Sequence, residues 1–593
     1  MTLDLKSRPK LAAIAAACLL TVALPSSTAM AAKVKTPTAE TTAPTTGVTT
    51  PPTFLVDVPD IDAVDSNVDD TTLRGIFTGD IVDNAEALAG LTATSISIPA
   101  VNVSFSGTVE GKQQSGEFSL KNLVLNDVED GVAASFTLGG VDLSSDQNVS
   151  GTFGAISATN FDIGAMLGIY GLVEAPKTTE LTPIYSDFKA EGGSLQAEAI
   201  TCNVGAVNVA EFKARPLKTS FGDIMALSQS METTSEGEAP SPELMGQLIH
   251  MYADIFTAFE SSPVVYDGID CKGTDDTGQL LDFSIAGITM DGLKPGRYPS
   301  ITMEGFKFAI PNEGEVSIGS LVMKAMDLSG PLAAVEAAPE AIDQAWLEAN
   351  ARALIPAFAG FSISDFSMDV ANPDAANERI KANIGAFDLS LADYLNGIPT
   401  NLSTTASKIV VDLPADSGDE QINQLIALGI KKVDFGFAVK AAWDEAANAI
   451  NIEDISIDGV DLARVGLSGT IGNATEALFA IDPDTALAAA MGIVVNNLKV
   501  NVTDAGLSDI ILAGVSADQG SDAATMRPIY AGLAEGTIIG VLAGAAEAQK
   551  VGKAVSAFVT GDAKELTIEM TAKDPAGLGL ADFMAAQEDP TLL

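Results

Sequence analysis

Residues 425–473 read LIALGIKKVDFGFAVKAAWDEAANAINIEDISIDGVDLARVGLSGTIGN and predict the end of a helix followed by three antiparallel strands. The first strand is expected over 433–443, and Asp444–Asn448 supply residues that favour a turn. The chain then returns as a second strand over 450–460, and 464–472 adds a third. One helix followed by a meander of strands is therefore the local building unit.

A nine-residue pattern from this unit recurs along the chain. Its copies are FSLKNLVLN at 118–126, FSIAGITMD at 283–291, FSISDFSMD at 361–369 and INIEDISID at 450–458. Each has apolar residues at positions one, three, six and eight, so strict alternation breaks between the third and the sixth. This break predicts strands that bury one face and that bend at a bulge near Asn122, Gly287, Asp365 and Asp454. The first residue of each copy, namely Phe118, Phe283, Phe361 and Ile450, is expected to be buried.

The first two copies belong to a longer internal similarity. Residues 118–167 and 283–332 align without a gap, and Gly131 and Gly140 correspond to Gly296 and Gly305. Glycines that a backbone conformation requires are expected to keep their register. We therefore predict a duplicated β-rich unit.

Between the groups of strands lie helical stretches with one apolar face, such as 242–260, 341–360 and 419–430. Leu244, Leu248 and Met251 show the spacing of three or four residues that is typical of an amphipathic helix. Helices that alternate with whole meanders favour an α+β fold with antiparallel strands over a βαβ fold. We expect a β-rich fold of bulged meanders, covered by the amphipathic helices.

The N-terminus predicts export. Lys6, Arg8 and Lys10 precede an apolar run at 11–24 that is too short to span a bilayer, and small residues follow at Ala29 and Ala31. We expect a signal peptide over 1–31 and a flexible tether rich in Thr, Pro and Asp over 32–70. Three further units are expected over 71–235, 236–400 and 401–593. The predicted location is the periplasm or the cell surface of a Gram-negative bacterium, with no transmembrane span in the mature chain.

The chain is strongly acidic, with 79 Asp and Glu against 32 Lys and Arg and a formal net charge of −47. Nucleic acid is not expected as a partner, because binding it requires clustered Lys and Arg. A solvated acidic surface is the favoured interpretation, and capture of divalent cations is the alternative. The acidic stretch 57–70 does not fit an EF-hand loop, since Asp70 and Ile76 stand where a glycine and a glutamate are required.

The sequence lacks the residues of common catalytic sites. His250 is the only histidine, lies in a helical stretch, and is not accompanied by a G-x-S-x-G motif. Phosphate-binding and dinucleotide-binding glycine motifs are absent from the sequence, and His and Cys are too few for a typical zinc site. We therefore expect no enzyme and no cofactor, and the sequence assigns no metal site.

Two features predict specific contacts. Cys202 and Cys271 end similar strand-like runs, EAITC and DGIDC, which predicts paired strands joined by a disulfide in an oxidising compartment. Gly532, Gly536, Gly540 and Gly544 form a stripe of small residues on a helix, where each glycine costs roughly 1 kcal/mol relative to alanine. Close packing within the fold is the favoured interpretation, and self-association and membrane insertion are the alternatives.

The segments LGI at 428–430 and AAWDEA at 441–446 resemble uncharacterised exported proteins of alphaproteobacteria, over roughly the last 180 residues. The repeated short strands are also similar, more loosely, to AsmA-like envelope proteins associated with lipid traffic. These observations favour a non-catalytic envelope or periplasmic scaffold that binds an unknown envelope protein or an apolar ligand. A lipid-handling protein and an acidic, calcium-dependent surface-layer or adhesive protein are the alternatives.

Overall fold

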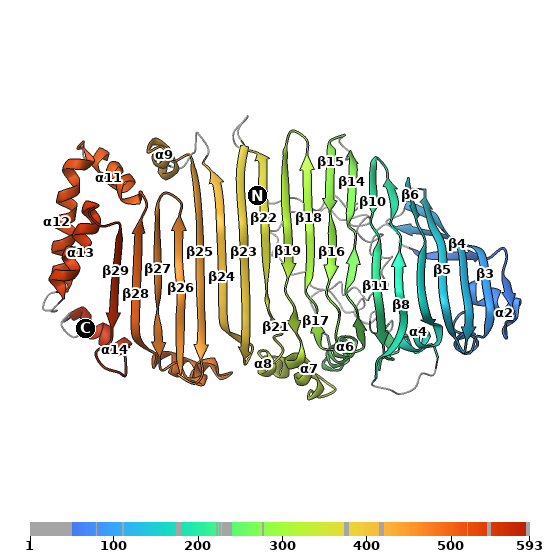
Figure 1. Ribbon diagram of the computed structural model, residues 1–593. Coiled ribbons are helices and arrows are strands. Elements are labelled where there is room, and N and C mark those ends of the chain that lie inside the picture. Colours follow the sequence, from blue (N-terminus) through green and yellow to red (C-terminus); the bar gives the residue numbers. More distant parts are fainter. Residues whose placement is uncertain are drawn as a thin grey trace, which may run out of the picture. The chain divides into compact units, whose positions relative to one another are not determined.

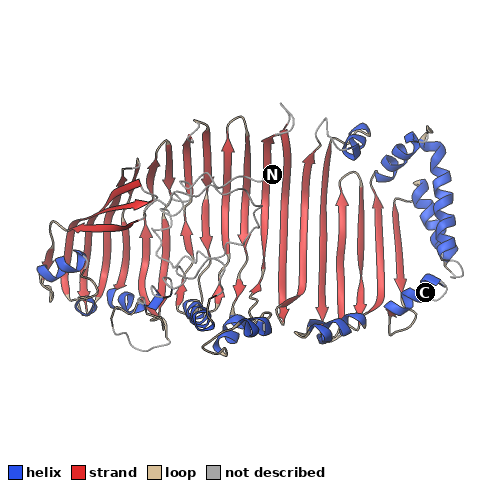
Figure 2. Cartoon of the chain, turned by 180° about the vertical axis from the view of Figure 1, so that it is seen from behind, coloured by secondary structure: helices blue, strands red, loops and turns tan. Residues whose placement is uncertain are grey.

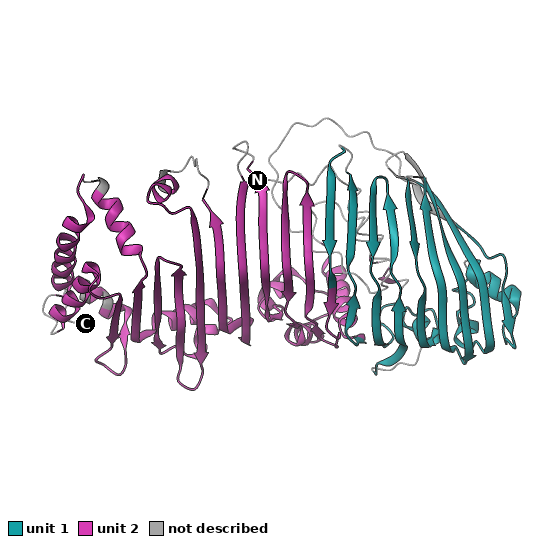
Figure 3. Ribbon diagram, turned by 45° about the horizontal axis from the view of Figure 1, so that its top comes forward, with its two compact units in different colours: residues 1–221, 260–287 teal, residues 222–259, 288–593 magenta. Residues whose placement is uncertain are grey.

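The computed structural model divides the chain into two compact units (Figure 3). Unit 1 contains Met1–Phe221 and Glu260–Gly287, and unit 2 contains Gly222–Phe259 and Ile288–Leu593. The structure describes residues 50–78, 80–109, 112–146, 148–173, 180–220, 223–224, 227, 240–274, 278–372, 379–413, 420–518, 520–542 and 547–588. The predicted signal peptide and the first part of the predicted tether lie outside these residues.

The fold class is α+β and β-rich, as predicted. About 50% of the chain is strand and 25% is helix, and the described residues contain 12 α-helices. The strand pairings described below are all antiparallel.

In unit 1 the sheet begins with long strands that pair in the order β1, β3, β4 and β5. Their bounds are Thr50–Asp57, Ala93–Val109, Lys112–Glu129 and Val132–Ser145. The first half of β5 pairs with β7 and the second half with β6, so the sheet divides there into two arms. At Gly140, where the partner changes, a Cβ atom would lie 2.9 Å from the Phe153 carbonyl oxygen, which requires glycine.

Shorter strands continue both arms of unit 1. The arm from β6 (Val149–Phe153) continues through β9 (Gly193–Ala197), β10 (Ile200–Val204), β14 (Ile269–Thr274) and β15 (Leu280–Ile285). The arm from β7 (Ile156–Asp162) continues through β8 (Thr182–Ala190), β11 (Val207–Ala214) and β13 (Val264–Tyr266).

Helices cover the apolar side of the long strands of unit 1. They are α2 (Asp70–Thr78), α3 (Ala85–Ala89) and α4 (Ile163–Ile169), and Asp162 caps α4 by accepting a hydrogen bond from the Ala165 amide. Leu73 of α2 and Leu88 of α3 join Ile96 and Ile98 of β3 in one buried cluster. The helices that cover this part of the sheet are not among the amphipathic stretches singled out in the sequence, which correspond to α6 (Pro242–Ile255), α8 (Gln344–Asn350) and α9 (Glu420–Ala427) of unit 2.

The prediction of a tether extending to residue 70 is wrong. Residues from Thr50 onward form β1 and the short strand β2 (Asp62–Val64), both paired with β3. Val58, Ile61 and Val68 are buried in the same cluster as β3. The many aspartates of 57–70 lie between these apolar residues. The average composition of the segment is therefore polar, although its apolar residues belong to the core.

The disulfide expected between Cys202 and Cys271 is present. The two cysteines face each other across the β10–β14 ladder with their Cα atoms 3.9 Å apart. Leu195 packs beside them in a small buried cluster. The two strands that contain these runs are thus paired, and the runs themselves extend in opposite directions from the pair of cysteines.

Unit 2 contains a ten-stranded meander in which each strand pairs with the next (Figure 1). The strands are β18 (Ile301–Ile310), β19 (Gly314–Met323), β22 (Gly360–Ala371), β23 (Arg379–Leu395), β24 (Ile398–Asp412), β25 (Lys432–Asp444), β26 (Ala449–Gly459), β27 (Ala463–Gly472), β28 (Val494–Asp504) and β29 (Glu565–Thr571). The expected unit boundary between 400 and 401 falls inside β24 and does not separate units.

The stretch 425–473 folds as its sequence indicates. The helix α9 (Glu420–Ala427) precedes β25, β26 and β27, with the turn at the expected place. The predicted bends are also present, because Asn122 and Asp365 adopt φ values of 49° and 51° and the register shifts between Ile452 and Ile455. The fourth bend is a break between β15 and β16 (Gly287–Met290). The four residues that begin the copies are half-buried rather than fully buried.

The two stretches of the expected duplication have a similar order of elements. Residues 118–167 run through β4, β5, β6 and β7 into α4. Residues 283–332 run through β15, β16, β17 (Arg297–Tyr298), β18, β19 and β20 (Met326–Asp327) into α7 (Ser329–Glu336). The corresponding Gly131 and Gly296 have φ values of 78° and 71°, in the left-handed region that favours glycine.

In unit 2 the helices lie at the ends of the strands and beyond β29 (Figure 1). Those at one end are α6 (Pro242–Ile255), α7 and α8 (Gln344–Asn350). Beyond β29 lie α11 (Leu507–Asp518), α12 (Ala523–Val541) and α13 (Ala548–Thr560). In the front and back views no described helix crosses the middle of β22–β28 (Figure 2). Among the described residues, the expected helical cover is therefore missing from most of this sheet.

Candidate functional site

The strands of unit 2 carry apolar side chains on one side in an unusually complete pattern. Along β25 these are Val433, Phe435, Phe437, Val439 and Trp443, which occupy alternate positions. Successive side chains of a strand point to opposite sides of the sheet, so these five share one side. We call this side of the unit 2 sheet the apolar face.

The strand register extends the apolar face across all ten strands. Starting from Phe437, the directly paired residues can be followed in both directions through every ladder. They form a first apolar row, from β18 to β29: Met303, Leu321, Ile363, Phe387, Ala406, Phe437, Ile457, Val465, Val502 and Leu566. Every member of the row is apolar.

A parallel row through Val439 repeats this composition with a single exception. This second apolar row contains Ile301, Met323, Phe361, Leu389, Thr404, Val439, Ile455, Leu467, Val500 and Ile568. Only Thr404 carries a polar group. Directly opposed apolar pairs of this kind stabilise neighbouring strands.

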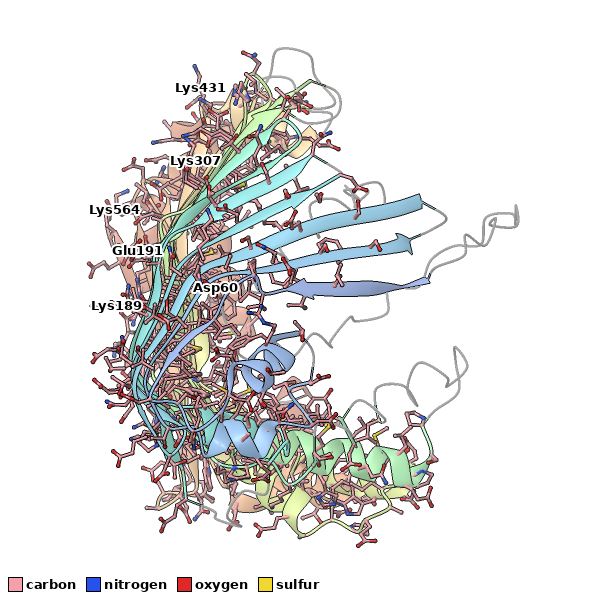
Figure 4. The ribbon with its side chains drawn as sticks, turned by 90° about the vertical axis from the view of Figure 1, so that its right-hand side faces the viewer. Asp60, Lys189, Glu191, Lys307, Lys431 and Lys564 are labelled. Atoms are coloured by element: carbon pink, nitrogen blue, oxygen red, sulfur yellow. A yellow bond between two sulfur atoms is a disulfide. The ribbon has the colours of Figure 1, made fainter. Side chains whose placement is uncertain are left out.

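The row that lies between these two points to the other side of the sheet and differs in chemistry. Its members are Thr302, Val322, Ser362, Asp388, Thr405, Ala438, Ser456, Gly466, Asn501 and Thr567. Lys307 and Lys564 lie along the outer side of the sheet in Figure 4. The sheet of unit 2 thus has one apolar and one polar side.

The apolar face is exposed at five of the twenty residues of its two rows, whereas the others are half-buried and Ala406 is buried. The side chains of Ile457, Met323 and Val465 are 53%, 43% and 41% exposed, and Ile455 and Ile568 are exposed as well. In the cluster of unit 1, by contrast, Ile98 of β3 is 0% exposed. Strands that carry an apolar side normally bury it against another layer.

The extent of the face exceeds what a protein surface ordinarily exposes. Ten strands about 4.8 Å apart, each contributing several residues at about 3.3 Å, give a footprint on the order of 1,000 Å². The largest exposed apolar patch of a typical monomer measures roughly 300–600 Å² and often has a function. The apolar face is therefore the strongest candidate for a binding site in the described residues.

At one end of the apolar face, aromatic contacts and hydrogen bonds fix the ends of the strands. The ring of Trp443, at the end of β25, lies 4.9 Å from that of Phe479, and its indole Nε1–H donates to the Ala474 carbonyl over 2.6 Å. Asn396, in the β23–β24 turn, donates to the Phe479 carbonyl. Burial raises the pKa of Tyr394, whose hydroxyl donates to the Phe358 carbonyl. These contacts hold the strand ends against the short helix at Glu476–Phe479.

Two aspartates of unit 2 that lie away from the apolar rows are paired with lysines. Lys324 donates to Asp388 on the polar side over 2.6 Å. Burial favours the neutral form of Asp388, but the hydrogen bonds from Lys324 and Ser390 outweigh it and lower its pKa. At the end of β28, Asp504 is nearly fully buried and accepts hydrogen bonds from Ser508 and Lys564. The apolar face itself offers a ligand almost no polar contact.

The glycine stripe is not the close-packed surface that the sequence favoured. Helix α12 ends at Val541, and Gly544 lies outside the described residues. A Cβ atom added at Gly532, Gly536 or Gly540 would meet nothing within 4 Å. The three described glycines of the stripe are therefore exposed on α12. Gly552 of α13 is the close-packed glycine instead, since its Cβ would lie 2.9 Å from Ile539 of α12.

The remaining candidate groups do not assemble into a site. The Nε2 atom of His250, on α6, lies 3.4 Å from the Pro339 carbonyl oxygen. Across the described ranges, His, Cys, Asp and Glu form no group of three or more that could hold a metal ion. No helix in these ranges is long and apolar enough to cross a membrane.

The apolar face was not expected as a binding site from the sequence. The signal was present, because the strands of 425–473 and the recurring nine-residue pattern show which side of each strand is apolar. The pattern does not indicate whether helices or a second sheet cover that side.

A family model described as an uncharacterized protein matches residues 456–593, which contain β27, β28, β29 and the C-terminal helices. A search of curated proteins and a search of solved structures each found no match.

Proposed function

We propose that this protein binds the acyl chains of lipids on the apolar face of unit 2 and acts, without catalysis, as an exported lipid-handling protein. The open pair of apolar rows is the observation that carries the proposal. The repeated short strands resemble those of AsmA-like envelope proteins, which are associated with lipid traffic, and this resemblance favours the same function. The predicted signal peptide would bring the protein to the envelope, where such ligands are abundant.

Acyl chains fit this face better than a protein surface does. Interfaces between proteins carry about one hydrogen bond per 100–200 Å², which fixes the partner's orientation. The two apolar rows offer one hydroxyl, that of Thr404, among twenty side chains. A ligand that needs no hydrogen bond and tolerates many orientations matches such a surface.

The dimensions agree with this ligand. Strand β25 has 13 residues and extends about 43 Å at about 3.3 Å per residue. The hydrocarbon core of a bilayer is about 30 Å thick, so one leaflet's chains extend about half of that. An extended acyl chain can therefore lie along a strand, and the ten strands provide room for more than one lipid.

The test is binding of a fatty acid labelled with nitrobenzoxadiazole, whose fluorescence rises in an apolar environment, to the full chain. Ile457→Asp places a carboxylate in the middle of the first apolar row, at a side chain that is already half exposed. We expect the affinity to fall about tenfold, equivalent to about 1.4 kcal/mol. The matched control is Asn501→Asp, which adds the same charge on the polar side and keeps the oxygen that accepts from Thr567.

Equal binding by Ile457→Asp and the unaltered protein, or no binding by either, would contradict the proposal. Light scattering supplies a second readout. If the unaltered protein is a dimer that Ile457→Asp converts to a monomer, and neither binds the probe, the face joins two copies and the lipid proposal fails.

A further inference from the structure

We infer that unit 1 carries a second binding site, for neutral oligosaccharides, in a hollow on the polar side of its sheet. The hollow has a volume of about 620 Å³ and is lined by residues of β3, β4, β5, β6, β9 and β10. The inference goes beyond lipid binding and does not depend on it, since its residues all belong to unit 1.

Two polar rows form the floor of the hollow. The first consists of Asn102, Ser119, Asp142, Thr152 and Ser194, each paired with the next across the sheet. The second consists of Glu117, Ser144, Ser150, Gln196 and Thr201 in the adjacent register. Hydroxyl, amide and carboxylate groups thus repeat at the strand spacing of about 4.8 Å.

The two rows differ in how their hydrogen-bonding capacity is used. In the first row, Ser119 donates to Asn102 over 2.7 Å, Thr152 and Ser194 lie 3.2 Å apart, and Asp142 is paired with Lys121. Within the described part of unit 1, the five side chains of the second row make no hydrogen bond or ion pair. The first row is therefore fixed by its own contacts, and the second is available to a ligand.

The available groups select the class of ligand. Glu117 accepts hydrogen bonds only, whereas the hydroxyls of Ser144, Ser150 and Thr201 and the amide of Gln196 both donate and accept. Sugar hydroxyls also donate and accept, so they complement all five. Phosphates and carboxylates find little free counter-charge here, because Lys121 is paired with Asp142, Lys272, which lies beside Thr201, is paired with Asp270, and the hollow contains two carboxylates.

The shape favours a chain of sugars over a single ring. A second hollow of about 500 Å³ shares Glu117 and Ser144 with the first and adds Ser104, Ser106 and Ser115. The hydroxyl groups thus continue from one hollow into the other, although Leu55 and Asp146 also line the second hollow. A ligand that repeats its hydroxyl groups along its length can use both.

The test titrates maltotriose, cellotriose and chitotriose into the full chain by isothermal calorimetry. We expect at least one to bind with a dissociation constant of about 1–10 mM. Gln196→Leu and Thr201→Val each replace hydrogen-bonding atoms with apolar ones of similar shape and should weaken binding about fivefold. Thr137→Val, on the polar side of β5 but outside the hollow, is the matched control and should leave binding unchanged.

Absence of binding at about 10 mM trisaccharide, or an equal loss in Thr137→Val, would overturn the inference. A titration with CaCl2 supplies a further control. If CaCl2 releases heat with the unaltered protein but not with Glu117→Gln, and no trisaccharide releases heat, the hollow is a cation site and the inference is overturned. All four variants should keep the affinity for the labelled fatty acid, so failure of this inference and failure of lipid binding are distinguishable.

Discussion

Unit 1 and unit 2 use the same kind of strand but treat its apolar side differently. In unit 1, α2, α3 and α4 bring Leu73 and Leu88 onto β3 and bury Ile98 completely. In unit 2, ten strands carry two apolar rows, and Ile457 and Val465 remain exposed. The difference indicates that the apolar side chains of unit 1 stabilise a core beneath helices, whereas many of those of unit 2 lie without such a cover and are the ones that the proposed lipid binding would use.

Removing the disulfide tests unit 1 by itself and should have the largest effect. Cys202→Ser with Cys271→Ser opens a loop with a sequence separation of 69, which the chain-entropy model values at about 4 kcal/mol. Hydrogen exchange should accelerate in β10 and β14 and stay unchanged in β25–β28. Faster exchange throughout unit 2 would show that the two units do not unfold separately.

A matched pair of isoleucines tests the comparison directly. Ile98→Ala in unit 1 leaves a cavity in a buried cluster and should cost about 3 kcal/mol of unfolding free energy. Ile457→Ala in unit 2 removes a side chain that is 53% exposed and should cost less than about 1 kcal/mol. The measurement is denaturant unfolding of each variant. Similar losses from both would mean that the apolar face is covered in solution.

The two isoleucines also show which features of the fold can be predicted from the sequence and which cannot. The alternation of apolar residues predicts the strands of 425–473, and the break in this alternation predicts the bends at Asn122 and Asp365. Both can be predicted because they depend on residues that are adjacent in the sequence. The runs EAITC and DGIDC were enough to pair Cys202 with Cys271. Burial is different, since it depends on whether a helix distant in sequence lies over the strand. Ile98 and Ile457 have similar local patterns, and only the tertiary arrangement separates them.

A substitution of Asp504 tests the hydrogen bonds that stabilise unit 2 at the end of β28. Its side chain is 3% exposed and accepts from the Ser508 amide and hydroxyl and from Lys564. Burial alone would raise the pKa of this carboxyl, but these hydrogen bonds outweigh it and lower the pKa. Asp504→Asn should therefore cost about 2 kcal/mol at neutral pH, because it removes a charged acceptor.

The pH dependence of this effect has a definite sign. A depressed pKa in the folded state contributes stability above the unfolded value of about 3.9, and this contribution is lost as the pH falls below it. The difference between the unaltered protein and Asp504→Asn should therefore be constant above about pH 5 and shrink in more acidic solution. A difference that grows as the pH falls would contradict the proposed role of the hydrogen bonds.

The smallest predicted effect compares two glycines on neighbouring helices of unit 2. Gly536 of α12 faces open space, so Gly536→Ala should stabilise the protein by about 0.5–1 kcal/mol through helix propensity alone. Gly552 of α13 lies against Ile539 and the Glu535 carbonyl, so Gly552→Ala must displace one helix from the other and should destabilise it. Opposite shifts in melting temperature are the expected result. Destabilisation by Gly536→Ala, together with a smaller particle in light scattering, would show that the stripe on α12 contacts a second copy and that close packing of its glycines occurs between molecules.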